Sequence, residues 1–339
     1  MDRRRFVALA AATVPLVAGC SGDEGTGGGP STSEPTTADD TGTDQPSEAS
    51  PSDAPSGSTE RVAVGEVASG ENLSMVVEGV ERTTSLDEFQ SADEGNVFVV
   101  VTLAVKNTTA NEFLNFSGFL QTAIEDSEDY SYDQTFAATD NTFDGGQLAP
   151  GEVSRGDLVY EVPEDASGLV LTFDFEAFSF TRLQRVTIDL SEQAASAATL
   201  DQNLQVDVHD PGTAVTYEDV TVTLNSVRFS EQVGDFASAA DGREYAIVNV
   251  TTDNGTDEEL TVSTLLQMGV KDDIGNTYDL DFAAQSELDR AYNEGQPIAA
   301  GGSRRGELAF EVPQSADRLY WTFEFTLWTD GDKTFWQLR

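Results

Sequence analysis

Hydrophobic residues beyond position 60 recur at every second position in several short runs. The clearest of these runs are Leu73–Met75–Val77, Leu171–Phe173–Phe175 and Val220–Val222–Leu224. A period of two places one side of a β-strand in a core and the other side in solvent. A longer β-branched run, Val97–Val105, predicts a strand that is buried on both faces.

Turn signals separate these runs at short intervals. They include Asp144-Gly145-Gly146, Pro150-Gly151, Asp210-Pro211-Gly212, Asn254-Gly255 and Gly275-Asn276. Short strands divided in this way predict an all-β fold of the sandwich type. The Cys…Trp…Cys pattern of antibody domains is missing, so the sequence predicts the architecture and not that particular class.

The pattern repeats once, at an offset of about 150 residues. Leu148–Phe175 and Ile298–Phe325 are identical at 13 of 28 positions, and the segment at Asn107 aligns with that at Asn254. The repeat predicts two tandem immunoglobulin-like β-sandwiches, at residues 61–190 and 204–339. Between them, residues 191–203 form a linker that is predicted to contain one helical turn at 194–200.

The first twenty residues have the features of an export signal. Arg3 and Arg4 precede one free position and then Phe6, which resembles the twin-arginine export signal. The apolar run 7–18 is too short to cross about 30 Å of hydrocarbon, but it has the length of a signal-peptide core. It ends in a sequence that resembles a lipobox, with cleavage expected between Gly19 and Cys20.

We therefore expect a signal peptide at 1–19 and a lipid on Cys20 that holds the protein on the outer side of the cell membrane. A buried core cysteine is the alternative for Cys20. Residues 20–60 are expected to form a disordered tether, because 36 of the 40 residues at 21–60 are Ser, Thr, Asp, Glu, Gly or Pro.

The chain carries a formal net charge of −43, from 61 acidic and 18 basic side chains. Such a charge repels phosphate backbones and argues against a nucleic-acid partner. The acidity is spread over the whole chain, and Lys106, Lys271 and Lys333 are the only lysines. This composition is typical of proteins from salt-loving archaea, with an ordinary acidic domain as the alternative.

Three segments of the repeat resemble a known family. They are the Gly65-Glu66…Gly70 opening, the Phe98–Asn107 strand and the Pro150–Pro163 segment. The family is the uncharacterised immunoglobulin-like domain family of bacterial and archaeal cell-surface lipoproteins, within the immunoprotective extracellular immunoglobulin-like superfamily. The second copy departs from it at Ala300, which replaces the turn proline. The resemblance implies the fold and a lipid-anchored, extracellular context, and it brings no catalytic residues.

Few residues point to chemistry. His209 is the only histidine and lies in a predicted turn, so a catalytic triad would depend on it alone. Acidic loops offer oxygen ligands for calcium at Asp253 and Asp257 and at Asp272 and Asp273, although neither loop has EF-hand spacing. Calcium is the one cofactor that these loops suggest, and solvated acidic hairpins are the alternative.

Sequons and tryptophans are the remaining candidates. Candidate N-glycosylation sites are the sequons at Asn72, Asn107, Asn115 and Asn254. The second and fourth occupy equivalent predicted turns, so we expect both to be exposed. All three tryptophans lie in the last nineteen residues, where Trp328 and Trp336 form either an exposed binding patch or part of the core.

These features together predict a non-enzymatic, lipid-anchored cell-surface protein that presents two immunoglobulin-like domains to a ligand. The ligand is an envelope protein, a glycan or a solute. One alternative is an accessory or ligand-capture subunit of a membrane transporter or sensor. A second is a secreted hydrolase with paired carboxylates, which requires a cleft that holds two facing acids.

The net charge also predicts that stability depends on salt. Like charges repel over about 10 Å at 0.1 M salt, whereas the screening length falls to about 3 Å at molar salt. We expect the melting temperature, measured by scanning calorimetry, to fall when KCl is lowered from molar concentration to about 0.1 M. An unchanged melting temperature would contradict the halophilic interpretation.

Overall fold

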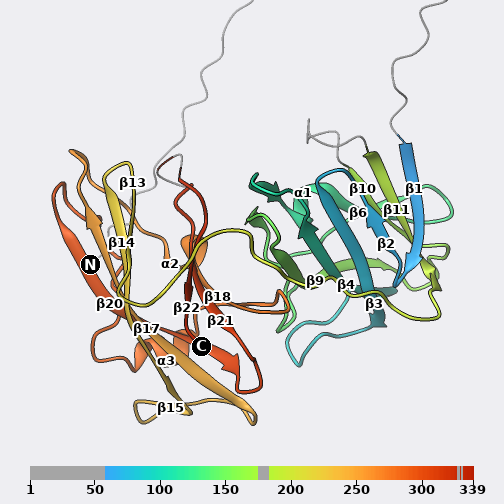
Figure 1. Cartoon of the computed structure of the whole chain (residues 1–339). Helices are drawn as coiled ribbons and strands as arrows, with labels where there is room; N and C mark the ends of the chain where they lie inside the picture. The colour runs from blue at the N-terminus through green and yellow to red at the C-terminus, as the bar shows by residue number, and fades with distance from the viewer. Residues whose placement is uncertain (1–57, 175–182, 327–328, 330) are drawn as a thin grey trace, which may run out of the picture. The chain divides into compact units, whose positions relative to one another are not determined.

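The computed structural model describes residues 58–174, 183–326, 329 and 331–339. Residues Ala54–Arg339 belong to one compact unit. Each copy of the repeat folds into a sandwich of two β-sheets (Figure 1), which confirms the all-β prediction.

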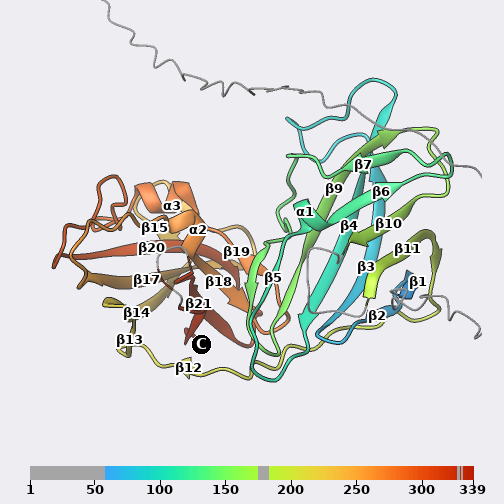
Figure 2. The same ribbon diagram turned by 90° about the horizontal axis from the view of Figure 1, so that it is seen from above.

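The first sandwich has one sheet with the strand order β2-β3-β4-β9 and one with the order β1-β11-β10-β6-β7. The strands of the first sheet are β2 (Val67–Ser69), β3 (Leu73–Thr83), β4 (Asn96–Asn107) and β9 (Val153–Pro163), of which β3, β4 and β9 run side by side in Figure 2. The second sheet contains β1 (Ser58–Val64), β11 (Leu183–Gln193), β10 (Val170–Asp174), β6 (Thr122–Glu125) and β7 (Ser131–Asp133). A short ladder of β5 (Leu114–Phe116) and β8 (Gly146–Leu148) and the helical turn α1 (Gly118–Gln121) lie outside these sheets.

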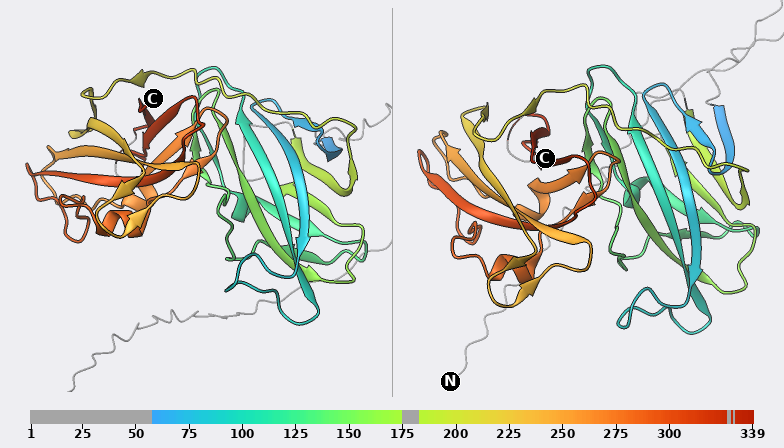
Figure 3. Two further views of the ribbon diagram at one scale, coloured as in Figure 1. Left: turned by 90° about the horizontal axis from the view of Figure 1, so that it is seen from below. Right: turned by 60° about the horizontal axis from the view of Figure 1, so that its bottom comes forward.

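The second sandwich repeats this arrangement, with the orders β13-β14-β17-β20 and β12-β22-β21-β18-β19. Its first sheet contains β13 (Ala214–Tyr217), β14 (Val220–Ser230), β17 (Arg243–Asn254) and β20 (Ser303–Pro313). Its second sheet contains β12 (Val208–His209), β22 (Thr334–Gln337), β21 (Leu319–Phe323), β18 (Met268–Asp272) and β19 (Thr277–Tyr278). The remaining elements are β15 (Gln232–Val233), β16 (Ala237–Ser238), α2 (Thr264–Gln267) and α3 (Phe282–Ser286). Two further views of all these strands are given in Figure 3.

Each sandwich is filled by side chains that its two sheets contribute. In the first, Met75 and Leu158 come from one sheet and Leu171 and Ile188 from the other, and all four are buried. Burying a side chain of this size stabilises a fold by about 1.5–3 kcal/mol. The predicted alternation in β3 therefore holds for its core face, and Val97–Val105 is buried as predicted along most of its length.

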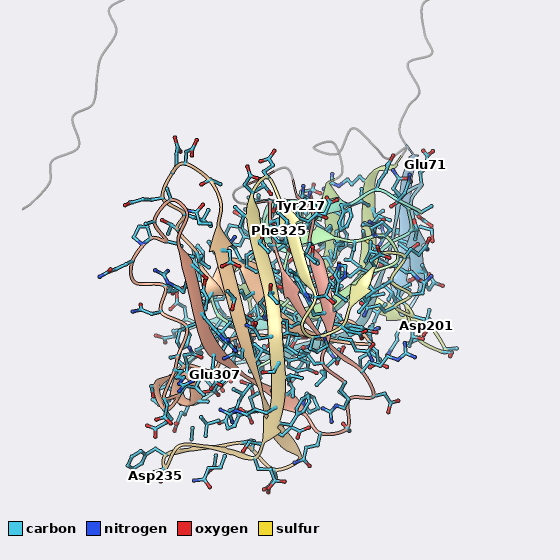
Figure 4. All side chains as sticks on the ribbon, turned by 60° about the vertical axis from the view of Figure 1, so that its left-hand side comes forward. Glu71, Asp201, Tyr217, Asp235, Glu307 and Phe325 are labelled. Atoms are coloured by element: carbon cyan, nitrogen blue, oxygen red, sulfur yellow. The ribbon has the colours of Figure 1, made fainter. Side chains whose placement is uncertain are left out.

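Aromatic rings dominate the second core. Tyr217 lies against Phe325, with ring centroids 4.8 Å apart (Figure 4), and the rings of Trp321 and Trp336 are 5.1 Å apart. Trp336 is fully buried, and its Nε1 donates a hydrogen bond to the Thr213 carbonyl. The exposed-patch alternative is therefore wrong for Trp336. Trp328 lies outside the described residues.

The linker follows a course that the sequence did not predict. No helix forms at 194–200: the Ala194 and Ala198 amides instead donate to the carbonyls of Val64 and Gly65. A single helical turn gains little by itself, whereas the extended course lets Leu200 cover Val76 on the outer face of the first sheet. The described strands also extend from Ser58 to Gln193, beyond the predicted limits of 61 and 190.

Gly156 on β9 and Gly306 on β20 are equivalent, and each allows a loop to pass close to the backbone of its edge strand. A Cβ at Gly156 would lie 2.5 Å from the Cα of Phe143, and one at Gly306 would lie 2.3 Å from the Cα of Tyr292. Atoms cannot approach so closely, so only glycine fits at either position. This contact explains why both copies of the repeat keep Gly here.

Candidate functional site

The asparagines of two predicted glycosylation sites have a structural role. Asn107 and Asn254 are buried at the ends of β4 and β17, and the Oδ1 of each accepts hydrogen bonds from the amide and hydroxyl of the Thr two residues later. Their Nδ2 groups donate to carbonyls just before β9 and β20, at Leu148 and Ile298 respectively. The expectation that both are exposed is therefore wrong. Each side chain is buried because it supplies hydrogen bonds to backbone amides and carbonyls that lack a backbone partner.

One of the calcium candidates is also used internally. Asp272 is buried, and its carboxylate accepts hydrogen bonds from the amides of Ile274, Gly275 and Asn276 and from the hydroxyl of Tyr278. Asp126 in the first sandwich is bonded in the same way to Tyr132 and to two amides of its turn. These aspartates cap equivalent turns. Because the oxygens of Asp272 already accept the hydrogen bonds named above, they have no free lone pair for a cation.

The other predicted residues are dispersed. Among the described residues, no group of three or more His, Cys, Asp or Glu side chains is arranged to hold a metal ion, so Asp253, Asp257 and Asp273 do not assemble into one. Asn115 is exposed and Asn72 is half-buried. The His209 ring packs against Trp336, with the centroids 5.8 Å apart.

The export-signal residues cannot be placed. Arg3, Arg4, Phe6, Gly19 and Cys20 all lie outside the described residues. Within the described part of the chain, none of the helices has the length and apolar character to cross a membrane.

The most unusual group in the structure is a set of buried charges where the two sandwiches meet. Glu152 follows the turn before β9 and is 0% exposed. Its Oε1 lies 3.0 Å from Nζ of Lys271, on β18, and 2.9 Å from Nζ of Lys333, before β22. Both lysines belong to the second sandwich, so one buried carboxylate of the first sandwich holds two ammonium groups of the second.

Burial and the neighbouring charges shift the pKa values of all three groups. Burial alone would raise the pKa of Glu152, but the ammonium groups of Lys271 and Lys333 and the Ala149 amide hold it below its usual value. Burial lowers the pKa of Lys271, with Glu152 opposing the shift. At Lys333 the carboxylates of Glu152, Glu324 and Asp144 outweigh burial and raise the pKa. Mutual contact therefore favours the ionised forms of Glu152 and Lys333, whereas burial works against the charge of Lys271.

Apolar packing and the linker complete this junction. Ala149 packs with Tyr320 and Phe335 in one cluster, and Leu204 and Val206 lie against it. Gln202 of the linker accepts a hydrogen bond from the Val153 amide and donates one to the Asp272 carbonyl. The third lysine of the chain, Lys106, donates to the linker carbonyl of Asp201. All three lysines are thus engaged at the junction or on its linker.

A cleft of about 180 Å³ opens beside the buried charges. Its polar walls are formed by Asn115, Asp144 and Gln147 of the first sandwich and by Asp279, Glu324 and Lys333 of the second. Burial raises the pKa of Glu324 to about 7, although the ammonium of Lys333 opposes the shift. Partial burial also raises the pKa values of Asp144 and Asp279, although both side chains keep contact with solvent.

Sequence reasoning missed this whole group. Two equivalent pairs show the signal that was available, because the repeat changes its charge there: Glu152 aligns with Gly302 and Lys271 with Glu125, whereas Lys333 aligns with Arg185 and keeps its charge. In the first sandwich, Arg185 and Glu125 form an ion pair with each other. A search for positions where the two copies differ in charge would have identified the junction.

Comparisons with known proteins place the chain in a family. The model for a domain of unknown function, DUF4352, matches residues 62–182 and 209–333, so the chain belongs to this family and carries two copies of its domain. No curated protein matches the chain.

Several solved structures resemble parts of the chain. An uncharacterised β-sandwich protein from Clostridium difficile 630 is 16% identical, over 40% of this chain and 97% of its own, with a TM-score of 0.28. A conserved hypothetical protein from Bacillus anthracis is 17% identical over 39% and 95%, with a TM-score of 0.32. A Bacillus subtilis protein described as a candidate lipoprotein is 14% identical over 56% and 73%, with a TM-score of 0.32.

Removing the buried carboxylate is expected to destabilise the junction strongly. Glu152→Ala leaves two ammonium groups without their shared partner, which costs about 3–5 kcal/mol. Denaturant unfolding in molar KCl measures this loss of stability. Glu152→Gln keeps the size of the side chain and removes its charge, so it should also destabilise the protein if the loss follows from charge. Glu88→Ala, at an exposed position, is the control and should change stability by less than about 0.5 kcal/mol. Equal effects of the three substitutions would contradict the assignment.

Glu324 is expected to make stability depend on pH. Because its folded pKa of about 7 exceeds the usual 4.5, the unfolded chain releases this proton first as pH rises. Folding stability should therefore fall between about pH 4.5 and 7, by about 3 kcal/mol, and then level off. Unfolding of wild type and Glu324→Gln across this range measures the difference, which should vanish at pH 4. A constant difference would show that the carboxyl does not titrate in this window.

Proposed function

We propose that this protein is a non-enzymatic, lipid-anchored cell-surface protein whose two sandwiches act as one rigid binding unit. The observation that carries the proposal is the contact of Glu152 with Lys271 and Lys333, removed from solvent between the sandwiches. Separating the sandwiches would leave Glu152, Lys271 and Lys333 without their ion-pair partners. This raises the free energy, because charged side chains that stay partly buried are then neither paired nor fully hydrated. A surface that spans both sandwiches is therefore presented in a fixed geometry.

The anchor and the export route come from the N-terminal motifs. Arg3, Arg4 and Phe6 support twin-arginine export, which carries folded cargo, and Gly19-Cys20 supports cleavage and lipid attachment. The acidic tether between Cys20 and the first sandwich lifts the binding unit away from the membrane. Most of this tether lies outside the described residues. The ligand is an envelope protein, a glycan or a solute on the extracellular side.

The cleft beside the junction bears on the hydrolase alternative. Asp144 and Glu324 face this cleft, but its volume of about 180 Å³ is below the ~300–1,000 Å³ of most ligand pockets. This small volume argues against the hydrolase alternative, which requires a cleft that holds a substrate between two facing acids.

Lipid anchoring is tested by Cys20→Ser in a salt-loving archaeal host. We expect wild-type protein in the membrane fraction, and the variant either released into the medium or retained as the uncleaved precursor. Ser21→Ala, which leaves the lipobox unchanged, is the matched control and should behave as wild type. A Cys20→Ser protein that remains in the membrane at its mature size overturns the anchor.

The rigid binding unit has a separate test. Cross-linking on intact cells at native salt should capture the same surface partner with wild type and with Glu88→Ala. Glu152→Gln, which loosens the junction, should lower the yield several-fold while the protein level on the cell is unchanged. An unaltered yield shows that each sandwich binds by itself.

A further inference from the structure

The contact between the two sandwiches joins different surfaces of equivalent domains. The second sandwich contributes the turn between β18 and β19, and the first contributes the outer edge of β9. The Arg155 amide donates a 2.9 Å hydrogen bond to the Gly275 carbonyl, and Arg155 pairs with Asn276 in a parallel bridge. Gly275 is needed because a Cβ there would lie 2.8 Å from the Val153 carbonyl oxygen.

A contact of this head-to-tail kind leaves one unused copy of each surface. The unused turn is Asp126–Tyr130 of the first sandwich, in which residues 127–130 are exposed. It has the same internal hydrogen bonds as the docked turn, and Asp129 has a φ of 65° where Gly275 has 102°. The free turn therefore has the conformation that docks elsewhere in the same chain.

The unused edge is Ser303–Arg305 at the start of β20. Arg305 pairs with β17 in the register in which Arg155 pairs with β4, so its amide points outward as that of Arg155 does. Within the described residues, no backbone carbonyl accepts a hydrogen bond from this amide. Ser303 and Arg305 are exposed, and Ser303 is smaller than its counterpart Val153. Because Asp129 carries a Cβ, its turn has to lie slightly farther from the edge carbonyl than the Gly275 turn does, and the smaller Ser303 side chain does not obstruct this shift.

The charges of the two free surfaces are complementary. The free turn is acidic, with Glu125, Asp126, Glu128 and Asp129, whereas the free edge carries Arg304 and Arg305. A cleft of about 170 Å³ beside the turn is lined by Asp126, Glu128 and Asp165, which suits an incoming guanidinium. Two adjacent arginines are uncommon in a chain with 18 basic and 61 acidic side chains.

We propose that copies of this chain associate head to tail, with the Asp126–Tyr130 turn of one copy docked on the Ser303–Arg305 edge of the next. The contact resembles the internal one, with an amide of β20 donating to the carbonyl of Asp129. Because each copy has one turn and one edge free, it can bind one neighbour on each side, and we expect an open chain of copies. The proposal stands on the docking geometry and does not depend on the lipid anchor.

The test uses the full chain carrying Cys20→Ser, in molar KCl, by sedimentation velocity over a wide concentration range. We expect the average mass to rise continuously with concentration. Arg305→Glu and Glu128→Arg should each weaken self-association at least tenfold, and the two substitutions together should restore it. Arg318→Glu, at an exposed arginine away from the edge, is the matched control and should associate as the parent does.

Three results would overturn the proposal. They are a monomer at all concentrations, a closed dimer, or association that Arg305→Glu leaves unchanged. Melting temperatures of the variants establish that each is folded, which is expected because both substituted side chains are exposed. The result is independent of the Cys20→Ser localisation test, since a soluble chain can still associate.

Discussion

The buried carboxylate of Glu152 is the interaction on which the arrangement of this protein depends. It holds two ammonium groups from the other sandwich and accepts the Ala149 amide within its own turn. A carboxylate with no exposed surface interacts strongly because little water weakens the attraction. Salt screens exposed pairs far more than buried ones. In a concentrated salt solution, a buried ion group therefore keeps its strength where surface ion pairs lose theirs.

The repeat separates the residues that build the fold from those that join its copies. Asn107 and Asn254 perform the same task at the ends of equivalent strands, and Asp126 and Asp272 cap equivalent turns. The differences lie at the contact, where Glu152 faces two lysines that the first copy lacks. One domain design thus acquires a specific neighbour through a few charges, while its strand arrangement stays the same.

The sequence carried information on this fold at the level of local pattern. Alternation at Leu73–Met75–Val77 predicted a strand with a buried face, and the repeat predicted two sandwiches, because both signals depend on neighbours along the chain. The linker helix failed because Leu200 is buried against Val76, a contact that only the folded chain creates. The glycosylation prediction failed at Asn107 because an Asn-x-Thr sequence also describes a side chain that bonds to the next turn.

The buried ion group of Glu152, Lys271 and Lys333 could not be predicted from the sequence, for a different reason. Glu152 and Lys333 are 181 residues apart in the chain, and no local pattern relates them. What the sequence does contain is the scarcity of lysine, since surface lysines are nearly absent from so acidic a chain. A lysine that persists in that composition is there for a specific contact, and Lys106, Lys271 and Lys333 all make one.

The docking geometry between the sandwiches and the proposed contact between chains differ in strength. Inside the chain it is reinforced by Glu152, by the apolar cluster around Tyr320 and by the linker, so the two sandwiches stay together. Between chains it has the exposed Arg305 and an exposed acidic turn, whose attraction salt reduces. Association between copies is then reversible and depends on local concentration, which confinement to a membrane surface raises. The proposed lipid anchor and the proposed head-to-tail contact would therefore act together, because the first would supply the concentration that the second requires.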